Sequence, residues 1–139
     1  MFLRKDVKLE LLKKVPLFSR CSKESLEEIS AIADEIDLPD GRELTREGER
    51  GREFFVLVEG EVDVTRKGDH LETLSAGDFF GEIALISDQP RTATVTAKGP
   101  IRVLVITDRA FGALRERAPG IDAEVQEAAA ERTAADDDL

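Results

Sequence analysis

Hydrophobic and polar residues follow two different periods along this chain, and the change of period divides it into three stretches. Residues 6–14 carry apolar positions between charges and end before Pro16, which cannot continue a helix. Ser22 is a suitable N-cap for a second helix with one apolar face. The residues of that face are Leu26, Ile29, Ile32 and Ile36. Farther on, a third helix is expected over 108–117, and Pro119 separates it from a last, alanine-rich helix.

The middle of the chain has the short alternating pattern of β-strands separated by turns. The expected strands are 55–58, 62–64, 71–74, 92–97 and 101–106. Turns are expected where glycine gathers with proline or charged residues, at 39–41, 59–60, 67–69 and 99–100. Short strands joined by tight turns favour a closed β-barrel or roll, here with helices before and after it.

Length and charge narrow the classes of function. A chain of 139 residues suits one hydrophobic core. Its net charge of −10 argues against direct binding to nucleic acid, because phosphate backbones attract basic surfaces. The segment from Gly120 onward has seven acidic residues and one basic residue, so it carries −6 and leaves −4 for the rest. Because its end has little apolar content, we expect 133–139 to be a disordered acidic tail.

The sequence also predicts a cytoplasmic protein. No apolar run approaches the length needed to span a bilayer, so we expect no membrane insertion by this chain. Charges interrupt the N-terminal stretch MFLRKDVKLELLKKV, which therefore lacks the continuous apolar core of a secretory signal. A single cysteine, Cys21, excludes an internal disulfide and fits a reducing compartment.

The candidate chemistry lies in residues 80–95, FGEIALISDQPRTATV. Glu82 begins a short helical turn and Arg91 lies just beyond it. Backbone N–H groups at the start of a helix attract phosphate, and Gly81 lets the backbone approach closely. Arg91 supplies a guanidinium that can hold phosphate oxygens in a bidentate fork. Glu82 would repel a phosphate unless it accepts from neutral hydroxyls such as those of ribose, so the segment predicts a nucleotide site.

This segment resembles, without a gap, the phosphate-binding cassette of the cyclic nucleotide-binding domain family of kinases, gated channels and bacterial regulators. The matching positions are Gly81, Glu82, Ala84, Leu85, Pro90, Arg91, Ala93 and Val95. Glycines also fall where that family's roll has them, at Gly48, Gly60 and Gly77. The alternative is that Glu82 and Arg91 form an ion pair that only holds a loop.

The resemblance implies a mainly β fold with flanking helices, a jelly-roll-like β-roll also described as a double-stranded β-helix. It covers roughly residues 10–130. The expected parts are an N-terminal helical segment at 1–35, the β-roll at 36–106 with the cassette at 80–95, hinge and lid helices at 107–132, and the tail at 133–139.

The resemblance also implies a role for each cassette residue. Arg91 would pair with the equatorial exocyclic oxygen of the cyclic phosphate, and Glu82 would accept from the ribose 2′-hydroxyl. The backbone N–H groups of Ile83 and Ala84 would meet the phosphate, and Gly81 would admit it. The ligand would be cyclic AMP, with cyclic GMP possible.

Thr92 has two interpretations. In the family, a hydroxyl at this position contacts the phosphate or a guanine amino group, which favours cyclic GMP, although bacterial members with a hydroxyl here can prefer cyclic AMP. A β-branched residue in a strand explains Thr92 equally well. The preference between the two nucleotides therefore stays open.

The function that follows is a regulatory sensor domain without catalytic activity, which signals by moving its C-terminal helices toward the bound base. A ligand-free docking or oligomerisation module of the same fold is the alternative. A DNA-binding regulator would need a helix-turn-helix with basic residues, and the 33 residues after Ile106 carry a net negative charge and leave no room for it. A cupin-like metal enzyme has a similar barrel of short strands, but His70 is the sole histidine and cannot form a multi-histidine metal site. The effector, the oligomeric state and whether the chain is an excised domain stay open.

Overall fold

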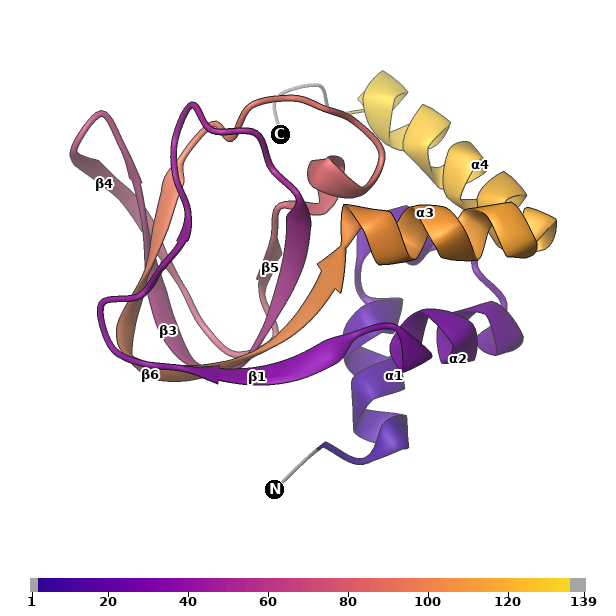
Figure 1. Ribbon diagram of the computed structural model, residues 1–139, viewed down its shortest axis with the longest axis horizontal. Helices are drawn as coiled ribbons and strands as arrows, with labels where there is room; N and C mark the ends of the chain where they lie inside the picture. Colours follow the sequence, from indigo (N-terminus) through magenta and orange to yellow (C-terminus); the bar gives the residue numbers. More distant parts are fainter. Residues whose placement is uncertain (1–2, 136–139) are drawn as a thin grey trace. The chain divides into compact units, whose positions relative to one another are not determined.

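The computed structural model describes residues 3–135, with helices at both ends of the chain and strands between them (Figure 1). The N-terminal elements are α1 (Lys5–Lys13), η1 (Pro16–Phe18) and α2 (Lys23–Ala31). The strands are β1 (Asp34–Leu38), β2 (Glu43–Thr45), β3 (Glu53–Arg66), β4 (Asp69–Leu74), β5 (Phe79–Phe80) and β6 (Thr94–Thr107), with the short helix η2 (Glu82–Leu85) before β6. The last helices are α3 (Asp108–Arg117) and α4 (Pro119–Ala135).

The chain forms two compact units, a strand unit at 34–108 and a helical unit from the segments on either side. The strand region therefore begins and ends two residues outside the predicted limits of 36–106. No helix within residues 3–135 is long and apolar enough to cross a membrane.

The strand unit is an antiparallel β-roll built around its two longest strands. β3 and β6 pair along most of their length, β1 and β4 add to their outer edges, and β2 and β5 pair with β6 and β3 (Figure 1). Successive side chains of β3 and β6 point to opposite faces of the sheet, and those on one face form a shared core. Its buried residues are Phe55, Leu57, Val62, Val64, Val95, Ala97, Ile101, Val103 and Val105. The predicted mainly β fold with flanking helices is confirmed.

Two of the expected turns lie inside strands. The prediction of a turn at 59–60 is wrong, because β3 continues through it with a shift of register on either side of Glu59. Gly60 adopts φ +92°, so its backbone makes a bulge that bends the strand without ending it. Residues 99–100 lie within β6 in the same way, opposite this bulge.

The helical unit follows the predicted pattern up to the end of α2. The Ser22 hydroxyl accepts a hydrogen bond from the Ser25 backbone N–H at 3.1 Å, which confirms the expected N-cap. Ile36 was wrongly assigned to the apolar face of this helix. The helix ends at Ala31, and Ile36 lies in β1 with 38% of its surface exposed.

The C-terminal helices begin near their predicted positions. α3 covers the predicted residues 108–117, and α4 starts with Pro119, a residue well suited to the first turn of a helix. α4 continues through Ala135 and so overlaps the start of the predicted tail at 133–139. The rest of that tail, 136–139, lies outside the described residues.

Candidate functional site

The predicted cassette lies wholly within the β-roll, and its helical part is one 3₁₀ turn, η2. Gly81 precedes the turn with φ +83°, a left-handed conformation that costs a residue with a Cβ about 1–2 kcal/mol. The Ala84 N–H donates to the Gly81 carbonyl oxygen at 3.1 Å, and the Ile86 N–H donates to the Ile83 carbonyl at 3.0 Å. The backbone that the sequence predicts for phosphate contact is therefore compact and begins at a glycine.

Glu82 is the first residue of this turn, and only 5% of its surface is exposed. A carboxylate is costly to bury, so it needs polar partners in its final position. Ala84 and Leu85 on the same turn are also buried, and Ile83 is half-buried. The turn thus carries its acidic residue into the roll and does not display it on the surface.

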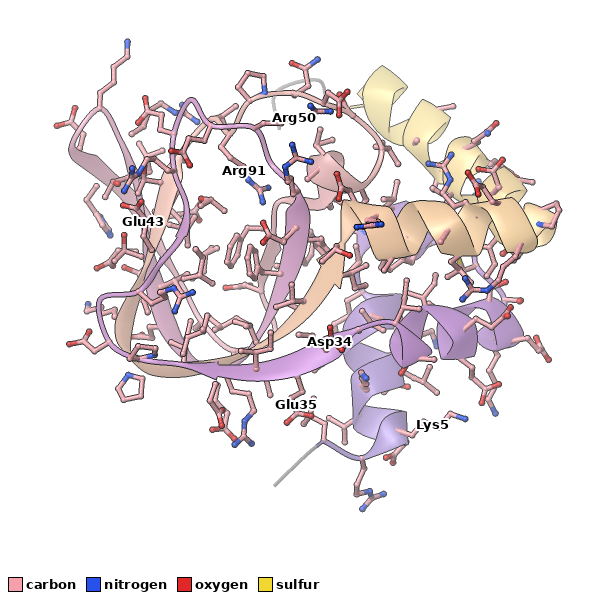
Figure 2. The ribbon with its side chains drawn as sticks, viewed as in Figure 1. Lys5, Asp34, Glu35, Glu43, Arg50 and Arg91 are labelled. Atoms are coloured by element: carbon pink, nitrogen blue, oxygen red, sulfur yellow. The ribbon has the colours of Figure 1, made fainter. Side chains whose placement is uncertain are left out.

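The backbone on both sides of Arg91 is held by the loop between β2 and β3. The Arg91 N–H donates to the Glu49 carbonyl at 2.7 Å, and the Gly48 N–H donates to the Arg91 carbonyl at 2.9 Å. Arg50 also forms a β-bridge with Pro90. Figure 2 shows Arg50 and Arg91 close together on this side of the roll. The position of Arg91 therefore depends on a segment about 40 residues earlier in the chain.

The Arg91 side chain is largely buried, with 9% of its surface exposed. Its guanidinium donates through Nη2 to the Glu53 carbonyl oxygen at 2.5 Å and through Nη1 to the Gly81 carbonyl oxygen at 3.4 Å. A Glu53 carboxylate oxygen lies 4.0 Å from Nη2. Both charged residues that the sequence predicts for the site, Glu82 and Arg91, are therefore largely buried. The Gly81 carbonyl contacts Arg91.

The Arg91 guanidinium stays charged although burial removes much of its hydration. Burial lowers the pKa of Arg91 from its ordinary value, and the attraction of the Glu53 carboxylate opposes that effect. Arginine keeps its proton at neutral pH in proteins even so. Nearby, Arg50 is exposed and pairs with Asp88 at 2.5 Å. Arg91 is thus the buried cation of this region, and Arg50 lies at the surface with its own counter-ion.

Thr92 lies just before β6, which begins at Thr94, so the prediction that it is a strand residue is wrong. Its side chain is exposed. Its carbonyl oxygen accepts a hydrogen bond from Arg66 Nε at 2.8 Å, which holds the backbone at this position. Thr92 therefore lies beside Arg91 with an exposed side chain.

Sequence reasoning missed two residues that contact Arg91, namely Gly51 and Glu53. Both lie in the stretch GERGRE, where a second glycine follows Gly48 by three residues. That spacing alone signals a turn, and nothing in it points to residue 91. The contact becomes visible only when the loop pairs with the end of the cassette.

Comparisons with known proteins identify the family to which this chain is similar. Residues 35–118, more than half of the chain, match the family described as the cyclic nucleotide-binding domain. The chain is 40% identical to a cAMP-dependent protein kinase regulatory subunit of Mycosarcoma maydis, over 81% of this chain and 23% of the relative. It is 38% identical to a cyclic nucleotide-gated potassium channel of Rhizobium etli, over 88% of this chain and 34% of the channel. The chain thus spans about a quarter to a third of these relatives.

A solved structure extends the likeness to nearly the whole fold. It is the N-terminal domain of a transcriptional regulator from Streptomyces coelicolor A3(2). The two structures are similar with a TM-score of 0.80 at 27% identity, and the match covers 93% of this chain and 96% of the other. The helices that flank the roll are therefore part of the shared architecture.

Proposed function

The chain belongs to the cyclic nucleotide-binding domain family, and from that premise we propose that its β-roll binds cyclic AMP, with cyclic GMP as the second candidate. The observation that carries the proposal is the buried guanidinium of Arg91, held by backbone carbonyls beside the turn of Gly81 and Glu82. A guanidinium with little water around it forms strong charge-assisted hydrogen bonds to phosphate. A regulatory relative of Mycosarcoma maydis that is named for cAMP supports cyclic AMP as the first ligand to test.

The phosphate would take over an acceptor role that a backbone carbonyl holds in this structure. The Gly81 carbonyl oxygen accepts from the Ala84 N–H and from Arg91 Nη1. Both donors are among those expected to reach the cyclic phosphate. A phosphate oxygen carries charge and is the stronger acceptor for each of them. Binding would therefore shift Ala84 and Arg91 from Gly81 toward the ligand without exposing either donor to water.

Glu82 would select the sugar. Its buried carboxylate is acceptor-only when ionised, and a ribose 2′-hydroxyl is a neutral donor that does not repel it. Thr92 would face the base or the phosphate from the edge of the site, because its side chain is exposed directly after Arg91. This arrangement supports a ribonucleotide over its 2′-deoxy analogue.

The proposed output is regulatory and passes through the C-terminal helices to a partner chain or domain. α3 begins at Asp108, directly after β6 ends at Thr107, so a change in the roll reaches it through continuous backbone. Within the helical unit, the Glu124 carboxylate of α4 accepts from the Ser25 hydroxyl at 2.7 Å and from the Ser22 N–H at 3.2 Å. Movement of α4 would exchange these bonds for contacts in a ligand-bound state, and the ligand could shift that balance only by its differential affinity.

Calorimetric titration with cyclic AMP and cyclic GMP tests the proposal, with 5′-AMP as a control that keeps base and sugar but opens the phosphate ring. We expect heat with at least one cyclic nucleotide. A free ligand concentration of about 100 times the dissociation constant stabilises the fold by about 2.7 kcal/mol, which is several degrees in melting temperature. If neither cyclic nucleotide gives heat or shifts the melt, the ligand-free docking module becomes the better proposal.

Hydrogen exchange on the same samples separates binding from signalling. We expect ligand to change exchange both in residues 81–95 and in residues 108–130. A change confined to 81–95 would leave the chain as a binding domain and remove the proposed role of its C-terminal helices.

A further inference from the structure

Gly51 is a buried glycine whose conformation does not explain why it is a glycine. Its φ lies outside the left-handed region, unlike that of Gly48 three residues earlier. An L-residue could therefore adopt its backbone geometry. The explanation lies in what surrounds it. A Cβ built at Gly51 would lie 2.7 Å from both Cζ and Nε of Arg91, and 3.0 Å from its Cδ.

The guanidinium of Arg91 thus lies directly against the Cα of Gly51. Gly81 is the second glycine against this group, since a Cβ there would lie 2.5 Å from Nη1. Both Cα atoms lie against the guanidinium without a side chain between, and the carbonyls of Glu53 and Gly81 accept hydrogen bonds from it. Neither a methyl group nor a larger side chain fits at residue 51 while Arg91 keeps this position.

We propose that Gly51 is a positioning residue for the phosphate site, which holds the Arg91 guanidinium in place by lacking a side chain. This inference rests on the proposed function as far as the phosphate is concerned. The atoms that a Cβ would meet all belong to the far end of a flexible side chain. Arg91 would therefore move aside while the backbone keeps its course. A small displacement is enough to lose its hydrogen bonds, because these weaken steeply with distance and angle.

The experiment is a double-mutant cycle on the full chain, with Gly51→Ala, Arg91→Ala and the double variant. Cyclic AMP affinity is measured by calorimetry. In the presence of Arg91, we expect Gly51→Ala to weaken binding about ten- to a hundred-fold, the effect of misplacing a positioned group by about 1 Å. In the Arg91→Ala background the same change should alter affinity by less than about two-fold, because the methyl group then has nothing to displace.

A ligand-free measurement keeps the test independent of nucleotide binding. The guanidinium NMR signals of Arg91 are assigned by their loss in Arg91→Ala. In Gly51→Ala we expect them to shift and to exchange faster with water. Gly112→Ala in α3 is the matched control, because Gly112 also has an ordinary φ and a Cβ there would meet nothing within 4 Å. It should leave the Arg91 signals unchanged.

The outcomes separate the two proposals. Unchanged Arg91 signals in Gly51→Ala, or an equal loss of affinity in both backgrounds, would overturn the positioning role. If the unaltered chain binds neither cyclic nucleotide but Gly51→Ala still displaces Arg91, the proposed function fails and the positioning role stands. If Gly51→Ala does not fold, recovery of folding in the double variant would support the collision with Arg91, and failure of both would contradict it.

Discussion

Glycines make room for different neighbours in two parts of the β-roll. In the cassette region, defined here as residues 48–53 and 81–91, Gly51 and Gly81 leave space for the Arg91 side chain. In the bulge region, defined as residues 59–61 and 98–102, Gly60 leaves space for another strand. A Cβ at Gly60 would lie 2.7 Å from the Pro100 carbonyl oxygen and 2.8 Å from a methyl group of Ile101.

The two regions differ in which atoms must move when a Cβ is added at the glycine. A side chain such as Arg91 can rotate at modest cost, whereas the strand at Pro100 is held by its ladder of hydrogen bonds. A methyl group in the bulge region should therefore damage the fold. In the cassette region it should damage chiefly the site. The same type of residue thus serves stability at one place and ligand recognition at the other.

The largest effect is expected for Gly60→Ala in the bulge region. The left-handed φ and the collision with β6 together should lower the free energy of unfolding by about 2–5 kcal/mol. Urea denaturation followed by circular dichroism measures this. Gly68→Ala is the matched control, since Gly68 has φ +83° but a Cβ there meets nothing within 4 Å. It should cost only the conformational part, about 1–2 kcal/mol. Equal losses of unfolding free energy in the two variants would show that β6 moves to make room for the methyl group.

Next in size is the effect of Arg91→Ala on binding. Removal of a buried charged partner should weaken cyclic nucleotide binding by about 2–4 kcal/mol, measured by calorimetry. Arg91→Lys should recover only part, because an ammonium lacks the planar fork. Arg50→Ala removes the same charge at an exposed position, so it should cost no more than about 1 kcal/mol. Equal effects at the two arginines would mean that net charge, and not the buried fork, drives binding.

Gly81→Ala should show both effects, because its Cβ would meet Arg91 Nη1 and also the Glu53 carbonyl oxygen at 2.9 Å. We expect a loss of unfolding free energy of at least about 1–2 kcal/mol, the cost of the left-handed φ alone, together with weaker binding. Gly77→Ala provides the comparison, since Gly77 has φ +96° and open space around it. Gly77→Ala should lower the free energy of unfolding and leave nucleotide binding unchanged. Full affinity in Gly81→Ala would show that Arg91 does not need a bare Cα at residue 81.

The smallest effect concerns Asp37, which pairs with Arg102 at the end of the bulge region. Arg102 Nε donates to Asp37 Oδ1 at 2.7 Å, and this hydrogen bond lowers the pKa of the Asp37 carboxyl. A lowered pKa contributes stability above the unfolded value, about 3.9, and that contribution is lost as the pH falls below it. Asp37→Asn should therefore make unfolding slightly less sensitive to pH below about 4.

Urea midpoints of both forms across pH 3–6, compared in an Arg102→Gln background, check this assignment. Without the arginine, Asp37→Asn should no longer change the acid sensitivity. A difference that persists would place its cause outside the Asp37–Arg102 pair.

Local signals in the sequence were the ones that the structure bore out. Ser22 caps its helix because the partner N–H lies three residues away, and Pro119 begins α4 because its ring suits a first turn. The predicted order of helices, strands and helices was also confirmed, because it too follows from patterns among neighbouring residues. The prediction failed at 59–60, since a glycine with positive φ marks a turn or a bulge equally well.

The sequence by itself therefore determined the class of fold and the chemical groups of the cassette, Gly81, Glu82 and Arg91, because these follow from neighbouring residues and their spacing. Only the tertiary structure decided where those groups lie. It buried Glu82, set Arg91 against Gly51 and Glu53, and placed Gly60 against Pro100. Each of the last two arrangements joins segments about 40 residues apart, and which strands meet depends on the packing of the whole core.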